Sequence, residues 1–538
     1  MKNNALNIVV VDATAAGKGR RRFTRDAIGI GVRSVCGVFE KHSIKSRIFL
    51  AEKVLDNGFQ GKFSHLFISG MSMDKIAVNK IIKLWRKNFS GKVVVGGPIT
   101  SELADSLIST KADLIVIGEG EFTLEELIRN NYLSSNGNIA NIETINGIGY
   151  FDEDNEVVIN NFRKYSTREE FHSFKASTES ILDYPNYFSA KVYVECVRGC
   201  SNFGGTRLKL SDGRECSECG YCESDCIDDR ANCPAKIPPG CGFCSVPSLF
   251  GPAKSKTVNH IVNEISQLLD YGVKRIILSA PDFLDFGRDD LVAPKPLFHP
   301  TNPKANVDRI EELLSKICSL EKVSSGRAWI EVENIKAILF TEEIAKILSK
   351  YLPNTPFSIG CETGSESHAK LLGRPSGPND TLRAVKIAHK YGLRAHVYFI
   401  HSLPGQNMET TKETAKLIKK LEPYIEKVTI YRFRPLPFSA FGDYPEPQPA
   451  VRNPESKLIS EAANQVNLSK KKDLVGETVR VVISEPNYRD ENGTIAYILG
   501  GGPMVAVENS RDKIGEILEI QVIRALSDKL ILGKIRAS

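Results

Sequence analysis

Nine of the twelve cysteines of this 538-residue chain fall within one segment, which runs from Cys196 to Cys244. Thiols spaced so densely seldom serve only as packing residues, because such runs usually supply metal ligands or disulfide partners. Disulfide frameworks are typical of short secreted chains, and this long chain shows no signal-peptide pattern. We therefore interpret the segment as a set of metal or cluster ligands around which the rest of the chain folds.

Three of these cysteines form a pattern with a specific chemical meaning. Arg-Gly precedes Cys200, and the later stretch 241–247 reads Cys-Gly-Phe-Cys-Ser-Val-Pro. The pattern resembles the Arg-Gly-Cys-x3-Cys-x-Phe-Cys-Ser-x-Pro segment of radical S-adenosylmethionine (SAM) enzymes. In that superfamily three thiolates hold a 4Fe–4S cluster whose fourth iron binds SAM. The resemblance implies that Cys200, Cys241 and Cys244 are catalytic cluster ligands and that Phe243 lies beside the cofactor.

The spacing departs from the family pattern at one point. Residues 201–240 separate Cys200 from Cys241, where the family has three residues. We interpret them as an insertion inside the motif loop. The long spacing leaves Cys196 as an alternative first ligand, although the Arg-Gly-Cys context favours Cys200.

The insertion carries a second metal signature. Cys216, Cys219, Cys222 and Cys226 have the Cys-x2-Cys-x2-Cys-x3-Cys spacing of bacterial ferredoxins, and a Cys-Pro pair follows at Cys233. We predict a second 4Fe–4S cluster on the first three, completed by Cys226 or Cys233. The alternative is tetrahedral zinc, because four thiolates also suit that ion.

The first region, residues 1–150, alternates short apolar runs with helical stretches. The runs at 7–11, 46–50, 65–70, 92–98 and 112–120 predict strands of a doubly wound, Rossmann-like α/β sheet. Ligands of such sheets bind at the carboxyl ends of the strands. The residues predicted at that edge are Asp12, Thr14, Gly17, Gly96, Gly97, Gly118 and Glu119.

Two segments of this region carry a resemblance of their own. Residues 95–98 (Val-Gly-Gly-Pro) and 117–121 (Ile-Gly-Glu-Gly-Glu) resemble the cobalamin-binding domain that precedes many radical SAM barrels. That family often ligates cobalt through a histidine in Asp-x-His-x-x-Gly, where this chain has Thr14. A hydroxyl is a poor substitute for imidazole. The resemblance implies cobalamin held without that ligand, or a Rossmann-like domain without the cofactor.

After a predicted linker at 151–189, residues 190–445 alternate again. Strands are predicted at 191–195, 275–279, 328–332, 356–365, 394–400 and 427–431, which gives the partial (β/α)6 barrel of the superfamily. Residues 360–365 (Gly-Cys-Glu-Thr-Gly-Ser) and 403–406 (Leu-Pro-Gly-Gln) resemble that family's Gly-x-Glu-Ser-Gly-Ser and Leu-Pro-Gly-Glu segments. The resemblance implies that Glu362 binds SAM. Ser279, Asp282 and Arg327 are further candidates at strand ends.

The chain closes with a different pattern. Residues 446–469 form a predicted linker because the stretch from Pro435 to Pro454 is rich in proline. Residues 470–538 contain short alternating runs with glycine-rich turns, which predict a small β-barrel. It resembles the TRAM domain, an RNA-binding barrel at the end of tRNA methylthiotransferases. Tyr488 or Tyr497 would offer stacking surfaces to RNA, and a purely structural barrel is the alternative.

Taken together, the resemblances imply a radical SAM enzyme that modifies tRNA through a 5′-deoxyadenosyl radical. Cobalamin-dependent methylation of an unactivated carbon of a tRNA nucleoside is the leading hypothesis. The alternatives are a tRNA methylthiotransferase that uses the second cluster, and a radical SAM methylase of a protein. A non-catalytic RNA-binding protein with structural metal is the hypothesis from another class.

Two further expectations concern the setting. No apolar stretch approaches the roughly 18 residues that a membrane span needs, so we expect a cytoplasmic protein with no membrane partner. The superfamily's chemistry implies an electron donor such as ferredoxin or flavodoxin. The formal net charge of +6 is small for this length and supports an anionic partner only weakly.

Overall fold

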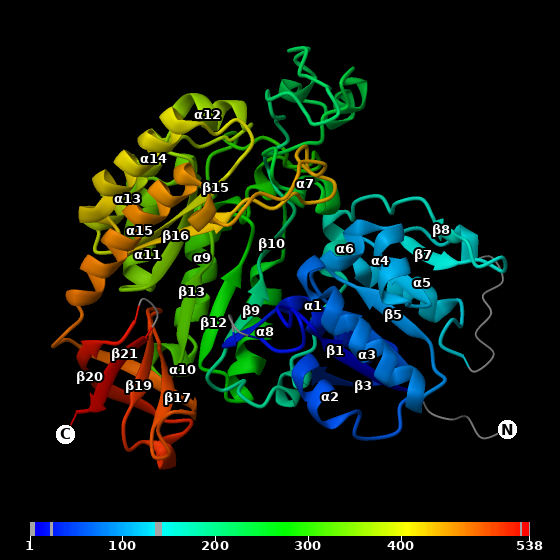
Figure 1. The fold of residues 1–538 in the computed structure, drawn as a ribbon, viewed down its shortest axis with the longest axis horizontal. Coiled ribbons are helices and arrows are strands. Elements are labelled where there is room, and N and C mark those ends of the chain that lie inside the picture. The colour runs from blue at the N-terminus through cyan, green and yellow to red at the C-terminus, as the bar shows by residue number, and fades with distance from the viewer. Residues whose placement is uncertain (1–5, 22–24, 135–141, 528–529, 537–538) are drawn as a thin grey trace. The chain divides into compact units, whose positions relative to one another are not determined.

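The computed structural model describes residues 6–21, 25–134, 142–527 and 530–536. It divides into two compact units, one of residues 1–193 with 266–272 and one of residues 194–265 with 273–538 (Figure 1). In the part of the chain that is described, no helix combines the length and apolar character needed to cross a membrane.

The first unit contains the predicted doubly wound sheet. Its strands have the order β3 (Lys45–Leu50), β1 (Asn7–Asp12), β4 (His65–Ser69), β5 (Val93–Gly96), β6 (Leu114–Val116), β7 (Ile148–Phe151) and β8 (Val157–Ile159). The first five pair in parallel, whereas β7 pairs antiparallel with β6 and β8 antiparallel with β7. The sheet thus continues past residue 150, because β7 and β8 pair onto its edge.

Helices connect the parallel strands of this sheet. They are α1 (Ile30–Lys41), α2 (Ala51–Asn57), α3 (Lys75–Asn88), α4 (Ala104–Thr110) and α5 (Gly120–Arg129). Helix α3 buries Ala77, Val78, Ile81 and Trp85, which recur at three- and four-residue spacing along one face. These side chains pack with Val9 and its neighbours in the core of the unit.

Most of the predicted partial barrel belongs to the second unit, although the division between the units falls within β9 (Lys191–Glu195) and α8 (Val258–Asp270). The barrel's strands are β9, β12 (Arg275–Ser279), β13 (Trp329–Val332), β14 (Pro356–Glu362), β15 (Arg394–His401) and β16 (Lys427–Arg432). Strands β12 and β13 pair in parallel, as do β14, β15 and β16, and a parallel bridge from Asn334 to Ser358 joins the two sets. The connecting helices include α8 (Val258–Asp270), α9 (Val307–Cys318), α11 (Glu342–Tyr351), α13 (Pro378–Lys390) and α14 (Met408–Leu421).

The prediction of a linker at 446–469 is wrong for the second half of that segment. Helix α15 (Pro454–Lys472) occupies it, and the side chain of Asn453 accepts a hydrogen bond of 3.1 Å from the Ser456 backbone N–H. An asparagine cap followed by proline at the first helical position is a helix-start signal. The helix buries Ile459, Ala462, Ala463 and Val466.

The C-terminal part forms the predicted small β-barrel, closed by five strands. In barrel order these are β17 (Thr478–Pro486), β18 (Thr494–Ile498), β19 (Met504–Val507), β21 (Leu530–Ile535) and β20 (Ile517–Ala525). Alternate residues such as Val481 and Ile483 point into its core. Closure leaves no unpaired strand edge.

This small barrel packs against the amino ends of the large barrel's strands. Arg394, the first residue of β15, donates hydrogen bonds of 2.8 and 3.1 Å to the carbonyls of Gly500 and Gly501. Arg480 donates a bond of 3.0 Å to the carbonyl of Gly326, shortly before β13. The small barrel therefore contacts the large barrel at the end where the strands begin.

Candidate active site

A narrow neck brings the two halves of the cysteine motif together. The backbone N–H of Gly240 donates a hydrogen bond of 2.6 Å to the carbonyl of Gly204, so the insertion leaves and rejoins the barrel at one place. The backbone N–H of Cys200 is held by the carbonyl of Gly251 at 3.1 Å. Cys200 and Cys241 therefore come together although 40 residues separate them in the sequence.

The three predicted ligand thiols lie near one another and are half-buried. Burial is the largest cause that raises the pKa of Cys244 to about 12, and the nearby thiols of Cys241 and Cys200 add to it. Burial likewise raises the pKa of Cys200 to about 11. Cys196 lies elsewhere, fully buried, with its thiol directed to the carbonyl of Val194 at 3.7 Å. The structure thus groups Cys200, and not Cys196, with Cys241 and Cys244.

A buried lysine network lies beside Cys200. The Nζ of Lys336 is 3.0 Å from a carboxylate oxygen of Asp282 and 3.2 Å from one of Asp285, and it donates a bond of 2.8 Å to Ser201 Oγ. Burial alone would lower the pKa of Lys336, but the two carboxylates raise it above its ordinary value. The ammonium charge also favours the thiolate form of Cys200. Sequence reasoning selected Asp282 but missed Lys336 and Asp285.

Glu362 lies at the carboxyl end of β14, as predicted, in a strained backbone conformation. Its φ is +67°, next to an irregularity in the pairing of β14 with β15. Burial raises the pKa of this carboxyl, and Arg374, 3.4 Å away, opposes the rise. The Arg374 guanidinium in turn lies 5.9 Å from the ring centroid of Phe243. Non-glycine residues with positive φ are uncommon and concentrate at functional sites.

Two other predicted residues, Ser279 and Arg327, lie at opposite ends of the barrel strands. Ser279, the last residue of β12, donates a hydrogen bond of 2.8 Å to Glu333, whose pKa burial raises. Arg327 does not join the site, because it precedes β13 and lies at the amino end of the barrel. There its mostly exposed side chain pairs with Glu321. The assignment failed because Arg327 precedes the strand, and only groups that follow a strand reach the carboxyl end.

The insertion gathers three of its five cysteines around one arginine. Burial lowers the pKa of Arg230, and the nearby thiols of Cys222, Cys233 and Cys219 oppose this effect. Cys226 is exposed. Cys216 packs against a separate apolar cluster. Over the described ranges, no three His, Cys, Asp or Glu side chains converge in an arrangement suited to a single metal ion.

The carboxyl edge of the first unit is held by its own polar side chains. The buried carboxylate of Asp12 lies 2.9 Å from Arg21 and accepts a bond of 2.9 Å from the Tyr184 hydroxyl. Asp74 accepts bonds from the backbone N–H groups of Ala15 and Gly17, at 3.0 and 2.6 Å. These contacts fix the loop in which the predicted cobalt-binding position occurs.

The fit of this edge to cobalamin differs from residue to residue. Thr14 is exposed and offers only a hydroxyl, so its position supplies no imidazole to cobalt. A Cβ added at Gly17 or Gly96 would meet no atom within 4 Å, which leaves the edge open at these glycines. The carboxylate of Glu119 is already bonded, to the backbone N–H and hydroxyl of Ser166 at 2.9 and 2.8 Å.

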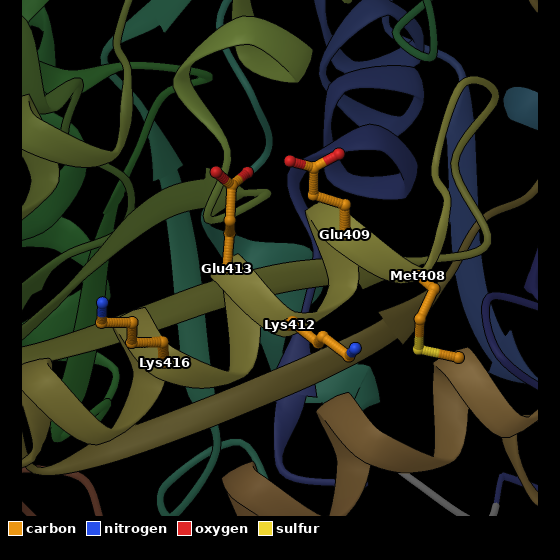
Figure 2. Close-up of a pocket in the computed structure, with 5 residues that line it drawn as sticks. All are labelled: Met408, Glu409, Lys412, Glu413 and Lys416. Carbon is orange, nitrogen blue, oxygen red and sulfur yellow. The ribbon is translucent and has the colours of Figure 1, made fainter.

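One hollow, of about 470 Å³, lies along α14. Figure 2 shows its lining, in which Glu409 and Glu413 project on one side of the helix and Lys412 on another. Its residues come from a single helix and include none of the predicted site residues. We assign it no role in the site.

The chain is similar to one known family and to several known proteins. Residues 232–418 match the family described as the radical SAM superfamily. "Uncharacterized protein MJ1620" of Methanocaldococcus jannaschii is 42% identical over 531 residues, which cover 98% of each chain. "Uncharacterized protein MK0932" of Methanopyrus kandleri is 38% identical over 98% of this chain and 96% of its own length.

More distant similarities extend to proteins with named activities. The ribosomal protein uS12 methylthiotransferase RimO of Sphingopyxis alaskensis is 24% identical over 262 residues, which are 47% of this chain and 55% of that protein. The cobalamin-dependent SAM radical enzyme OxsB aligns with a TM-score of 0.55 at 14% identity, over 86% of this chain and 56% of its own. The radical SAM methyltransferase TsrM of Kitasatospora setae aligns with a TM-score of 0.55 at 13% identity, over 81% of this chain and 74% of its own.

Proposed function

We propose that this chain, which belongs to the same family as MJ1620 and MK0932 and carries a radical SAM domain, is a radical SAM methyltransferase that acts on an unactivated carbon. The observation that carries the proposal is that Cys200, Cys241 and Cys244 lie near one another despite the insertion, with Asn202 donating hydrogen bonds to the sulfurs of Cys200 and Cys241. A radical SAM domain implies a 4Fe–4S cluster and SAM. These three thiols would hold three of its irons.

When it is bound, such a cluster supplies the electron that cleaves SAM to methionine and a 5′-deoxyadenosyl radical. The residues of this chain would prepare the site for that chemistry. Lys336 and Arg374 place positive charge beside the thiolates, which favours their deprotonated forms. Glu362 and Glu333, both half-buried near strand ends, would accept hydrogen bonds from the polar groups of SAM or substrate. Burial of these groups would exclude water from the reactive radical.

The proposed source of the methyl group is a cobalamin bound by the first unit. Its likeness in fold to OxsB and TsrM supports cobalamin at the open glycine edge, where it would supply a methyl group. The protein would not supply a histidine ligand to cobalt, because Thr14 occupies that position. Electron paramagnetic resonance of Co(II)-loaded protein tests this point. Labelling with 15N-histidine should leave the ligand-nitrogen splitting on the cobalt hyperfine lines unchanged, and a change in that splitting would contradict the assignment.

A tRNA nucleoside is the first substrate class to test. The closed C-terminal barrel supports it, through its resemblance to the TRAM domain and the side chain of Tyr488, which is 87% exposed in the turn after β17. Tyr497 is unsuited to stacking on RNA, because it is buried under Arg275 with 5.4 Å from guanidinium to ring centroid. We place the reaction in the cytoplasm, with ferredoxin or flavodoxin as the electron donor.

Methylthiolation is the second candidate. It is favoured by the gathering of Cys219, Cys222 and Cys233 in the insertion, where a second cluster would serve as sulfur donor. The similarity to RimO, over about half of that protein, supports the same chemistry. The name of RimO also keeps a protein substrate under consideration.

The test uses anaerobically reconstituted full-length protein incubated with labelled SAM, with or without cobalamin, and with either bulk tRNA or ribosomal proteins. We expect 5′-deoxyadenosine and cobalamin-dependent methyl incorporation into tRNA. Incorporation into tRNA of a mass that contains sulfur would support methylthiolation. Methyl label found only in protein would replace tRNA with a protein as the proposed substrate. No SAM cleavage under any condition would overturn the proposed function.

A further inference from the structure

One buried asparagine contacts two of the three ligand thiols. Asn202 is only 3% exposed. Its backbone N–H donates to the sulfur of Cys200 at 3.3 Å, and its side-chain N–H donates to the sulfur of Cys241 at 3.3 Å. It is the second residue of the insertion, and no family pattern in the sequence singles it out.

The orientation of the Asn202 amide is fixed by its other partners. The remaining side-chain N–H donates a bond of 3.0 Å to the carbonyl of Gly373, and Oδ1 accepts a bond of 3.2 Å from the backbone N–H of Gly204. A carbonyl accepts only and a backbone N–H donates only, so the two partners determine which end of the amide is nitrogen. The nitrogen therefore faces Cys241, and both of its hydrogens are used.

These contacts link the two sides of the interrupted motif. Three residues between the first two cysteines would hold them together covalently, whereas 40 residues cannot. Asn202 supplies a non-covalent connection in their place, next to the neck bond from Gly240 to Gly204. Its bond to Gly373 ties the same point to the segment that follows the short helix α12 (Glu366–Leu371).

The same hydrogen-bond donors would affect the reduction potential of a bound cluster. Reduction adds negative charge to a cluster, and hydrogen bonds to its sulfur ligands stabilise the reduced form and raise the reduction potential. Arg374 adds a longer contact to Cys241 at 3.9 Å, and Lys336 adds positive charge near Cys200. The donors therefore concentrate on Cys200 and Cys241.

We infer that Asn202 is a positioning residue that joins Cys200 to Cys241 and raises the reduction potential of the SAM-cleaving cluster. The inference rests on the proposed function, because it requires that these thiols hold that cluster. It goes beyond it, since the role belongs to a residue of the insertion that binds neither SAM nor substrate.

The experiment compares two substitutions with a matched control in the reconstituted full-length protein. Asn202→Asp keeps the shape and the bond from Gly204 but cannot donate to Cys241, and Asn202→Ala removes the side chain without adding charge. Asn467→Ala is the control, because Asn467 also makes two backbone hydrogen bonds, to Val428, and touches no thiol. The readout is a redox titration of the cluster signal that changes when SAM is added, together with iron content and melting temperature.

We expect the ratio of reduced to oxidised site cluster, at a fixed potential, to fall about tenfold in Asn202→Ala and further in Asn202→Asp. Tenfold corresponds to 59 mV for one electron. The control should titrate like the natural protein. Equal potentials in all variants, at equal iron content, would overturn the inference and leave the proposed function intact. A natural protein with no SAM-responsive cluster would overturn both.

Discussion

The two ends of the large barrel are stabilised by different kinds of interaction. At the carboxyl end, charged groups are buried together, as with Lys336 between Asp282 and Asp285 and Arg374 beside Glu362. At the amino end, Trp329 packs against apolar residues of the small barrel, and Arg394 donates to backbone carbonyls and pairs with the half-buried Glu426. Buried charge is costly unless it is compensated, whereas apolar packing and neutral acceptors carry no such demand.

The difference indicates a division of labour between the two ends. Barrel enzymes place their chemistry at the carboxyl ends of strands and use the opposite end for stability. In this chain the C-terminal barrel contacts the amino end of the large barrel, and the predicted cluster thiols lie at its carboxyl end. Substitutions at the two ends should therefore differ in kind, because one end depends on charge balance and the other on docking.

The largest expected effect comes from the charge network. Lys336→Met leaves Asp282 buried without its cation and Asp285 with only Arg288, which should cost about 3–5 kcal/mol of unfolding free energy. Chemical denaturation of the metal-free protein measures this loss. Lys350→Met is the control, because Lys350 pairs with Glu311 at the surface, and it should cost less than about 1 kcal/mol. Similar losses in both variants would contradict the comparison.

A smaller effect is expected at the docking end. Arg394→Ala removes the bonds to Gly500 and Gly501 and leaves Glu426 without its arginine, at a cost of about 1–3 kcal/mol. Hydrogen exchange should quicken in β18 and β19 while the iron content stays that of the natural protein. Arg309→Ala, which breaks only surface ion pairs, controls for loss of charge. Loss of iron in Arg394→Ala would show that the two ends are coupled.

Acid should act on the same docking contact. Burial opposes ionisation of Glu426, but hydrogen bonds from His396 and Arg394 lower its pKa to about 2, from 4.5. A carboxylate with a lowered pKa stabilises the fold above its unfolded value and loses that contribution as pH falls toward the folded value. The loss should reach about 1 kcal/mol by pH 4, measured as a shift in the urea midpoint. Glu426→Gln should remove this part of the acid sensitivity.

The smallest expected effect distinguishes the roles of two cysteines in the insertion. Cys233 lies near Cys219 and Cys222 around Arg230, whereas Cys226 is exposed. Cys226→Ala should leave the metal content of the insertion and the melting temperature unchanged, while Cys233→Ala should release the second metal. Iron and zinc analysis of both variants measures this. The opposite pattern would make Cys226 the fourth ligand and show that metal binding rearranges the insertion.

Local sequence was sufficient for much of the fold. The apolar runs that became β1 and β12 are short and continuous, so their strand character is visible in any window. The C-terminal barrel was equally readable from its alternating residues. The helix α15 was missed because a proline-rich run precedes it, although Asn453 and Pro454 form a start signal that the sequence contains.

The candidate site was predictable only in part. The grouping of Cys200 with Cys241 followed from a family resemblance, since nothing in their separation of 40 residues indicates it. Lys336 and Asn202 carry no pattern, because their roles arise from contacts across the fold. The error at Arg327 has the same origin, since a residue near a strand can belong to either end of the barrel.

The central claim is that Cys200 completes the cluster motif across the insertion, and one measurement tests it directly. Formation of 5′-deoxyadenosine from SAM is followed anaerobically in the natural protein, in Cys200→Ala and in Cys196→Ala, with iron measured in each. We predict that Cys196→Ala retains SAM cleavage and that Cys200→Ala abolishes it together with the SAM-responsive cluster signal. Cleavage by Cys200→Ala, with loss in Cys196→Ala, would contradict the account.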